Sequence, residues 1–387
     1  MFFTINNTVP VLFGKRVSLQ TGQKLRELRV KKVLCVYDRG VKEAGIIDPI
    51  LKNIRALGIG VVEFDGVLPD PPDTVVDEGG AIGQQEQVDC VLGIGGGSSL
   101  DAAKAINILI NNQLPFRRYM GLSAQPHKPG VKLVLIPTTS GTGSEVTNIS
   151  VITDSHSHLK NTCVGRNYTA NLAIVDPTLT LKLPASITAA TGMDALAHAV
   201  EAYTSVAVNP MSDILAEKAI ELIVKYLPIA VENGQDLDAR TQLAFASTIA
   251  GYCFSNALIH VGHGIGHALG TMYHIPHGIG CAIALPGAVE SVAEIYPERI
   301  KRLSQLLGEP VLDKISSNEQ AKIVADSLRS LNKKLSLPTL QEFKIGESDL
   351  AAVAEVAVKD ISCTFTARKL GTHDILTILK HEYALTS

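Results

Sequence analysis

The first 183 residues alternate between short apolar segments, rich in β-branched side chains, and segments with helical periodicity. Strands that alternate with helices are typical of a parallel sheet covered by helices on both faces. This alternation restricts the first half of the chain to an α/β fold. It predicts strands at 32–37, 60–64, 89–94 and 132–136, helices at 40–57, 74–86 (capped by Asp73) and 99–110, and shorter strands at 149–153 and 171–175.

The pattern changes near Leu183-Pro184, beyond which long helical segments follow, several of them separated by prolines. The sequence therefore predicts an α/β domain over 1–183 and an all-helical domain over 184–387, with a ligand-binding cleft between them. The expected helices span 185–205, 210–232, 237–256, 258–271, 278–292, 296–307, 318–334, 348–358 and 372–381.

Composition excludes several classes of protein. With 46% hydrophobic and 19% charged residues, the chain can bury a large core and is not disordered. The net charge is -3 and no basic stripe is present, so no nucleic-acid partner is expected. The sequence has no apolar run of about 20 residues and no signal-peptide pattern, which predicts no membrane association. Six scattered cysteines without a CxxC pair predict reduced thiols in a cytoplasmic protein.

A glycine-rich turn, Gly95-Gly96-Gly97-Ser98-Ser99, joins the strand at 89–94 to the next predicted helix. Glycines let backbone N–H groups approach a phosphate, and a helix N-terminus attracts negative charge. Taken alone, three glycines favour the simpler interpretation of a tight turn that needs positive φ. Two neighbouring features favour a dinucleotide site: Asp101, expected to cap the helix, and the polar turn 137–145 after another strand.

Asp38 is the candidate ribose-binding acid, although it ends the first strand and precedes the glycines. The common dinucleotide fingerprint places its acid about 20 residues after the glycines instead. An equal alternative is that Asp38 begins a turn through Arg39 and Gly40. The residues alone leave both interpretations open.

Potential metal ligands gather in the second half of the chain. Asp194 and His198 are an i,i+4 pair on a predicted helix, so their side chains share a face and suit one metal ion. Five more histidines follow between 260 and 277. The i, i+3, i+7 spacing of the first three predicts a shared helical face, and Pro276 breaks the pattern before the last. These histidines are His260, His263, His267, His274 and His277.

Several buried imidazoles on facing helices need a common partner, because an unpaired buried polar group is costly. Nitrogen and oxygen donors without thiolate suit Fe(II), Zn(II), Mn(II) or Ni(II) and exclude an iron–sulfur cluster. The alternative is a pH-sensing or merely polar helix face.

Six segments of the chain match one known family in order. They are GGGSSLDAAK (95–104), IPTTSGTGSEVT (136–147), IVDPTLT (174–180), TAATGMDALAHAVEAYTS (188–205), HGIGHALGTMYHIPHGIGCAIALP (263–286) and the weaker VKDISC (358–363). In these segments the chain resembles the iron-containing, group III alcohol dehydrogenases, which include lactaldehyde reductase and 1,3-propanediol dehydrogenase. The resemblance implies a dinucleotide-binding α/β domain followed by an all-helical metal-binding domain.

The resemblance also implies roles for individual residues. His267 would handle protons near the substrate, and Asp38 would hold the adenosine ribose of NAD(H). The ligands of one divalent metal, Fe(II) with Zn(II) as the alternative, would be Asp194, His198, His263 and His277. Other cofactor contacts would come from Gly95, Gly96, Gly97, Ser98, Ser99, Thr138, Thr139, Thr142, Thr147, Val151 and Lys160, and the substrate pocket would be lined by Phe254 and Cys363.

The chain departs from the family pattern at three places. His274 stands where the family often has Asn, and His260 is an added imidazole, so each is a candidate surrogate ligand or pocket residue. Thr366-Ala367-Arg368 replaces the family's Asn-Pro-Arg, which bears on substrate specificity.

The implied reaction is hydride transfer between NAD(H) and a small primary alcohol or diol, or its aldehyde, by a homodimer or larger homo-oligomer. Related enzymes, a zinc-dependent glycerol dehydrogenase or a maleylacetate reductase, are the nearest alternatives. Two alternatives come from other classes: a metal-dependent hydrolase or lyase that acts on a phosphorylated substrate, and a non-catalytic metal-storing protein. Nicotinamide binding and turnover separate these possibilities.

Overall fold

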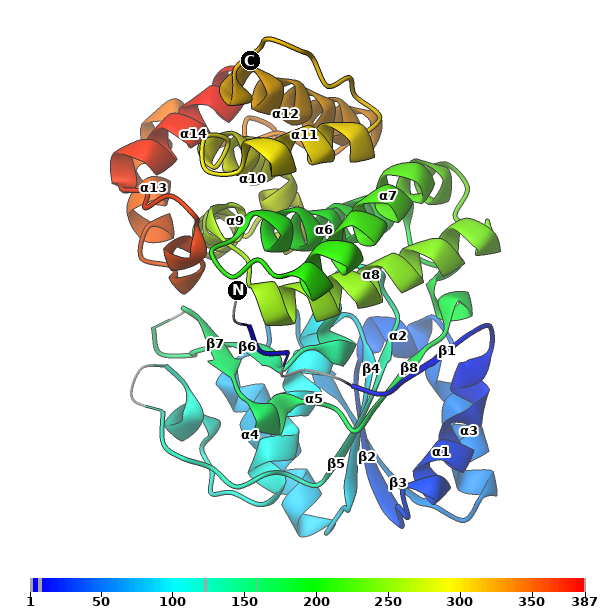
Figure 1. Ribbon diagram of the computed structural model, residues 1–387. Coiled ribbons are helices and arrows are strands. Elements are labelled where there is room, and N and C mark those ends of the chain that lie inside the picture. Colours follow the sequence, from blue (N-terminus) through cyan, green and yellow to red (C-terminus); the bar gives the residue numbers. More distant parts are fainter. Residues whose placement is uncertain (1–2, 6–8, 122–123, 158, 386–387) are drawn as a thin grey trace. The chain divides into compact units, whose positions relative to one another are not determined.

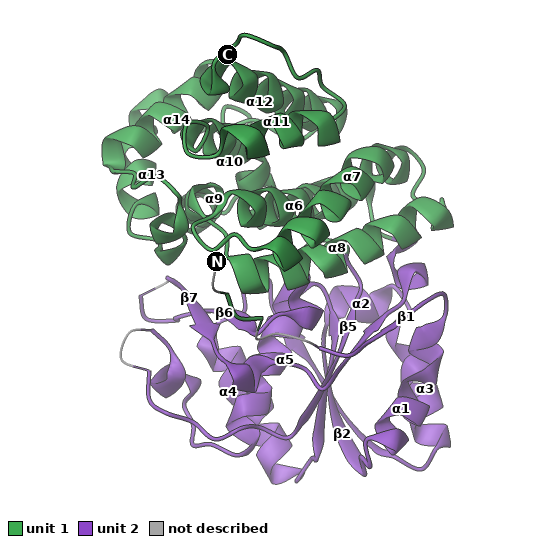
Figure 2. Ribbon diagram, in the orientation of Figure 1, with its two compact units in different colours: residues 1–5, 140–142, 183–387 green, residues 6–139, 143–182 purple. Residues whose placement is uncertain are grey.

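The computed structural model describes residues 3–5, 9–121, 124–157 and 159–385 (Figure 1). The chain divides into two compact units (Figure 2). The α/β unit contains residues 6–139 and 143–182, and the helical unit contains residues 1–5, 140–142 and 183–387. The predicted fold class, an α/β part followed by a helical part, is confirmed.

A parallel six-stranded sheet forms the centre of the α/β unit, in the order β1-β8-β5-β4-β2-β3. Apolar residues of α1 and α3 pack on one face of the sheet, and α4 and α5 lie on the other (Figure 1). The strands are β1 (Val11–Phe13), β2 (Lys32–Asp38), β3 (Gly60–Val67), β4 (Cys90–Gly95), β5 (Lys132–Pro137) and β8 (Leu172–Val175). The helices are α1 (Thr21–Glu27), α2 (Arg39–Glu43), α3 (Ile47–Ala56), α4 (Asp73–Gln85) and α5 (Gly97–Ile110).

The strand order places the predicted cofactor residues at one edge of this sheet. β4 pairs with β2 on one side and with β5 on the other. Because the three strands are parallel, Asp38, Gly95 and Thr138 all lie at or just beyond their carboxyl ends. Ligands of open α/β sheets bind at this edge, where the strand order reverses.

Several local expectations for this unit are wrong. The helix expected at 40–57 is two helices, because the chain turns at Gly45 with φ +72°. Asp73 is the first residue of α4 and does not cap it; its carboxylate accepts the Ser155 N–H at 3.0 Å and pairs with Arg117 at 3.0 Å. The Asp73 carboxylate is thus bound by Ser155 and Arg117, which are distant in sequence, and not by the backbone N–H groups at the start of α4.

Two strands were not predicted. β1 has only three residues, too few for a periodic signal, and pairs with β8 at the sheet edge. β7 (Lys160–Val164) forms a separate antiparallel hairpin with β6 (Ile149–Thr153). Its sequence, KNTCV, is mostly polar and only partly buried, so apolar patterning could not identify it.

Helices of the helical unit begin and end close to the predicted bounds. Close packing between two of them depends on glycine: a Cβ on Gly266 would lie 2.8 Å from the Cys281 Sγ, and one on Gly280 would lie 3.1 Å from the Gly266 Cα. The helices are α6 (Ala185–Thr204), α7 (Pro210–Glu232), α8 (Leu237–Ala257), α9 (Val261–Tyr273), α10 (His277–Ser291), α11 (Pro297–Leu306), α12 (Ser317–Lys334), α13 (Leu350–Ala357) and α14 (Thr372–Ala384).

One helix start differs from the prediction. The helix expected from residue 258 begins at Val261, because Leu258 has φ +68° and ends α8 in a turn. Among the described residues, no single helix is long and apolar enough to cross a membrane. Only α8 and α9 together reach that length and composition, and they are bent by 106°.

Candidate functional site

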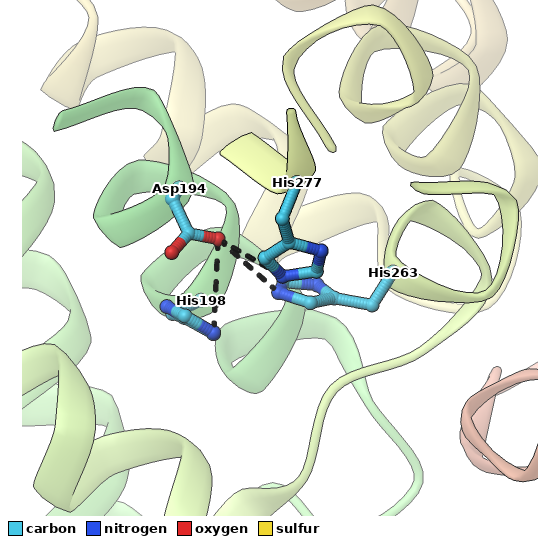
Figure 3. Close-up of side chains that lie close together, drawn as sticks. All are labelled: Asp194, His198, His263 and His277. Atoms are coloured by element: carbon cyan, nitrogen blue, oxygen red, sulfur yellow. Dashed lines mark ion pairs between the residues drawn. The ribbon is translucent and has the colours of Figure 1, made fainter. Parts of the chain in front are cut away.

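Four predicted ligands from three helices meet in the helical unit. Asp194 and His198 lie on α6, His263 lies on α9 and His277 begins α10, and one ligand atom from each lies within 4.8 Å of the others (Figure 3). The Asp194 Oδ1 lies 3.4 Å from the Nε2 of His277, 3.8 Å from that of His263 and 4.0 Å from that of His198. Two ligands of a tetrahedral ion, bound at about 2.1 Å, lie roughly 3.4 Å apart. The four side chains thus surround a position that suits one cation.

The four side chains are largely buried, and two of their ligand atoms lack a hydrogen-bond partner. The Asp194 side chain is 3% exposed and that of His263 is 1% exposed. Within the described part of the chain, the Asp194 Oδ1 and the His263 Nε2 are buried and have no hydrogen-bond partner. An unsatisfied buried group costs about 1–3 kcal/mol. A bound divalent cation would satisfy both atoms, so the donor set fits a metal.

The electrostatics of the cluster agree with this interpretation. Burial, assisted by the nearby Glu201, raises the pKa of Asp194 to about 8. Burial, assisted by His267, lowers the pKa of His263 to about 3, and burial holds the pKa of His198 well below its usual value. The rings of His198 and His263 are therefore neutral and keep a lone pair for coordination. Burial and Glu201 both oppose ionisation of Asp194, which a bound cation would favour.

His267 lies one turn beyond His263 on α9 and is not part of the four-residue set. Its ring stacks on the His277 ring with centroids 5.2 Å apart, and its Nδ1 lies 2.9 Å from the Asp360 Oδ2. Burial opposes ionisation of Asp360, but the hydrogen bond and charge of His267 hold the pKa of Asp360 below its usual value. Asp360 had no predicted role, although it lies in the matched VKDISC segment, three residues before Cys363.

The two additional histidines lie outside the set. His260 precedes α9, so the expected shared face of His260, His263 and His267 is wrong; its Nε2 lies 2.9 Å from the Thr204 Oγ1. His274 is exposed and ends α9 with φ 54°, in the left-handed region. Asn and His adopt that conformation more readily than most residues. His274 can therefore replace the family's Asn because both residues tolerate the left-handed conformation at the end of α9.

The predicted pocket residues lie against these helices. The Phe254 ring stacks on the His198 ring, with centroids 4.2 Å apart and planes 13° apart. The Cys363 Sγ–H donates to the Ala357 carbonyl at 3.1 Å, and burial raises the pKa of this thiol to about 12. Cys363 is therefore a neutral packing group. It lies so close to α9 that a Cβ on Gly264 would be 2.4 Å from its sulfur.

In the α/β unit, Asp38 connects two turns. Its Oδ1 accepts the Val41 N–H at 3.0 Å and caps α2, and its Oδ2 accepts the Ser99 Oγ–H at 2.8 Å. The interpretation of Asp38 as a turn residue is therefore correct, and its ribose role stays a prediction.

Gly95 has φ +153°, and a Cβ there would lie 2.5 Å from the Ser99 Cβ. Gly96 precedes α5, which begins at Gly97 and not at Ser99 as expected; Ser98 is partly exposed in its first turn.

Asp101 does not cap α5 as expected. Its Oδ1 accepts the Ser144 Oγ–H at 2.6 Å and its Oδ2 accepts the Val151 N–H at 3.0 Å. Lys104, fully buried, donates to the Ser144 Oγ at 2.8 Å, the Thr147 Oγ1 at 2.9 Å and the Ile149 carbonyl at 2.6 Å. Burial lowers the pKa of Lys104 to about 8. This pair fixes the segment that carries Thr147 and Val151 to α5.

The remaining predicted cofactor residues are distributed over both units. The Thr138 N–H donates to the Gly95 carbonyl at 2.9 Å, and the Thr139 side chain lies beside Gly96. The Lys160 Nζ pairs with the Asp70 Oδ1 at 2.7 Å. Thr142 belongs to the helical unit.

Comparisons with known proteins agree with the resemblance. The family described as "Iron-containing alcohol dehydrogenase" matches residues 9–177, and "Fe-containing alcohol dehydrogenase family, C-terminal" matches residues 188–383. An NAD-dependent methanol dehydrogenase of Bacillus methanolicus is 37% identical over 96% of this chain and 97% of its own. An NADPH-dependent butanol dehydrogenase of Clostridium saccharobutylicum is 34% identical over 93% and 94%. The crystal structure of a 1,3-propanediol oxidoreductase has a TM-score of 0.94 at 35% identity, covering 99% of this chain and 100% of that one. The chain therefore belongs to the iron-containing alcohol dehydrogenase family.

Proposed function

We propose that this protein is a metal-dependent NAD(H) oxidoreductase that interconverts small primary alcohols or diols and their aldehydes. The observation that carries the proposal is the buried Asp194 oxygen that faces three imidazole Nε2 atoms. Of these four atoms, the Asp194 Oδ1 and the His263 Nε2 have no hydrogen-bond partner in the described chain. Asp194, His198, His263 and His277 would hold the metal, Fe(II) with Zn(II) as the alternative. Bound there, it would supply Lewis acidity to the substrate oxygen.

His267 would move the proton. The Asp360 carboxylate, 2.9 Å from the His267 Nδ1, accepts the hydrogen on that nitrogen. The Nε2 is then the atom that takes or gives a proton, because a neutral imidazole has one donor and one acceptor. Stacking on the His277 ring keeps the His267 ring beside the ligand set. Asp360 thus orients a general acid–base group.

The α/β unit would bind the cofactor. The glycine turn and the N-terminus of α5 would hold the pyrophosphate, and the remaining lone pairs of Asp38 would accept hydrogen bonds from the adenosine ribose. A 2′-phosphate would bring like charge to Asp38. The relatives are named for both NAD and NADPH, so their names do not decide which cofactor this chain uses. The proposed preference for NAD(H) therefore rests on Asp38.

We also propose a cytoplasmic homo-oligomer of two or more chains, without a nucleic-acid or membrane partner. Balanced charge supports the absence of a polyanion partner. All six cysteines are buried, and the described residues contain no disulfide, as expected of a reducing compartment.

The test uses apo-protein prepared with a chelator and reconstituted with Fe(II), Zn(II) or Mn(II). NADH binding is followed by fluorescence, and turnover by nicotinamide absorbance with a panel of small alcohols, diols and aldehydes. The proposal expects NADH binding with or without metal and turnover only with metal. Activity on a phosphorylated substrate without nicotinamide would favour a hydrolase or lyase. Metal uptake with neither NADH binding nor turnover would favour a metal-storing protein.

A further inference from the structure

A buried carboxylate lies directly behind one of the proposed metal ligands. Glu201 follows Asp194 by seven residues and His198 by three, so all three share a face of α6. Its side chain is 0% exposed. Its Oε1 lies 3.0 Å from the His263 Nδ1, and its Oε2 accepts the backbone N–H of His260. Both oxygens are therefore engaged, one of them by a proposed metal ligand.

This contact selects which nitrogen of His263 faces the other ligands. A carboxylate accepts hydrogen bonds, so the Nδ1 of His263 carries the hydrogen and the Nε2 carries the lone pair. The Nε2 is the atom that lies 3.8 Å from the Asp194 Oδ1. With the opposite tautomer, a hydrogen would occupy the position of the cation.

His260 stabilises Glu201 through its backbone and not through its ring. The Thr204 hydroxyl donates to the Val200 carbonyl at 2.8 Å, so its oxygen accepts from the His260 Nε2–H at 2.9 Å. The Nδ1 of neutral His260 then has no hydrogen, and it lies 3.7 Å from the Glu201 Oε2, too far for a hydrogen bond. His260 is thereby held away from the metal position, as a support for Glu201.

The sequence of α9 accommodates this carboxylate. A Cβ on Gly262 would lie 2.2 Å from the Glu201 Oε1, so only glycine at 262 lets the carboxylate reach His263 without displacement. Gly262 has an ordinary helical conformation, so its backbone does not require glycine. Close approach to Glu201 is the physical reason for glycine there.

We propose that Glu201 is a positioning residue for the metal, orienting His263 through its Nδ1–H and supplying a second buried negative charge. Asp194 and Glu201, whose side chains are 3% and 0% exposed, would together carry the charge that balances a divalent cation. The inference rests on the proposed metal-binding function. Partners of this kind, behind ligating histidines, raise ligand basicity and fix ring orientation.

The experiment measures Zn(II) affinity of the full-length apo-protein by competition with a chelator, together with thermal unfolding of the apo-protein by circular dichroism. Glu201→Gln keeps the shape and removes the charge, and should weaken Zn(II) binding roughly 10- to 100-fold. Glu201→Asp restores the charge on a shorter side chain and should recover part of the affinity. A purely structural role predicts the opposite order, because aspartate leaves a void that glutamine does not.

Glu382→Gln is the matched control. Glu382 is a 7% exposed carboxylate of the same unit, bonded to Arg329 at 2.6 and 3.0 Å. This variant should lose thermal stability and bind Zn(II) as the unmodified protein does. If Glu201→Gln does not fold, Gly262→Ala displaces the same carboxylate and should weaken Zn(II) binding in the same way.

The two proposals fail in different ways. A folded Glu201→Gln or Gly262→Ala variant with unchanged Zn(II) affinity overturns the role of Glu201 and leaves the metal site intact. If the unmodified protein binds no metal, the proposed metal function itself is wrong, and if it binds metal equally well without His277, the proposed ligand set is wrong.

Discussion

The two units contain polar clusters of opposite character. In the α/β unit, Asp38, Asp101 and Lys104 are all paired within the protein, by bonds of 2.6–3.0 Å. In the helical unit, the Asp194 Oδ1 and the His263 Nε2 are buried and have no hydrogen-bond partner in the described chain. In the first cluster the protein itself supplies the hydrogen-bond partners, and in the second two buried atoms lack them. We infer that the α/β cluster is formed before any ligand binds, whereas the helical cluster requires a cation.

Glycine serves different purposes in the two clusters. Gly95 is needed partly for its backbone, with φ +153°. Gly262 and Gly266 lie inside α9 and are needed because Glu201 and Cys281 come too close for a side chain. A turn therefore shapes the first cluster, and close helix packing shapes the second.

The largest expected effect tests the incomplete cluster. His277→Ala removes one of the four proposed ligands and should lose most of the bound metal, with turnover falling on the order of 1,000-fold or more. NADH binding should persist, because the proposed cofactor residues around Gly95 are untouched. His274→Ala, three residues earlier and exposed, is the control and should keep metal and turnover. Full metal occupancy of His277→Ala, measured by elemental analysis, would contradict the assignment.

The next effect separates proton transfer from metal binding. His267→Ala should keep the metal and lose roughly 100- to 10,000-fold in rate, the usual contribution of a general acid–base group. The pH profile of kcat/KM should change as well. If metal is lost together with activity, His267 is a ligand and its role as a proton carrier is wrong.

The third effect tests the completeness of the α/β cluster. Lys104→Met leaves Asp101, whose side chain is only 14% exposed, without its cation and should cost about 3–5 kcal/mol of unfolding free energy, measured with urea. The control is Lys42→Met, which breaks an exposed pair with Asp65 and should cost at most about 1 kcal/mol. Equal losses in the two variants would mean that the buried pair contributes no more than a surface pair.

A smaller, pH-dependent effect tests the contact between Asp360 and His267. Because the folded-state pKa of Asp360 lies below its unfolded value, the contact stabilises the protein above about pH 4 and loses this effect as the pH falls through the folded pKa. Asp360→Asn should therefore cost about 1.5–3 kcal/mol near pH 6 and progressively less as the pH falls below about 4. Urea unfolding over a series of pH values measures the difference. A cost that does not vary with pH would contradict the charged contact.

The smallest effect concerns the choice of cofactor. Asp38→Gly removes a carboxylate that would repel a 2′-phosphate and should narrow the preference for NAD(H) over NADP(H) by about 10-fold. Loss of the α2 cap should cost only a few tenths of a kcal/mol, since glycine is tolerated there. Asp65→Asn is the control for losing an acidic residue elsewhere in this unit. If the ratio of kcat/KM values does not move, Asp38 is only a turn residue.

Prediction from sequence succeeded where the signal is local. Alternation identified the parallel sheet, and helical periodicity located α7 at its observed bounds, Pro210–Glu232. The expectation that Asp194 and His198 share a helical face needed only the i,i+4 spacing, and both side chains do lie in the four-residue cluster. Prediction failed where one residue changes the path of the chain. Gly45 divides a helix, and Leu258 removes His260 from the face that it was expected to share with His263.

The sequence by itself determined the family, the fold class and the residue types from which a metal site could be built, because these depend on composition and on spacing along the chain. Only the tertiary structure decided which polar groups meet. Asp360 reaches His267 across 93 residues, and Glu201 reaches His263 across 62. No periodicity encodes such pairs, since they depend on how closely helices pack. The same packing separated His260 and His274, which lie at the two ends of α9, from the four side chains whose ligand atoms face one another.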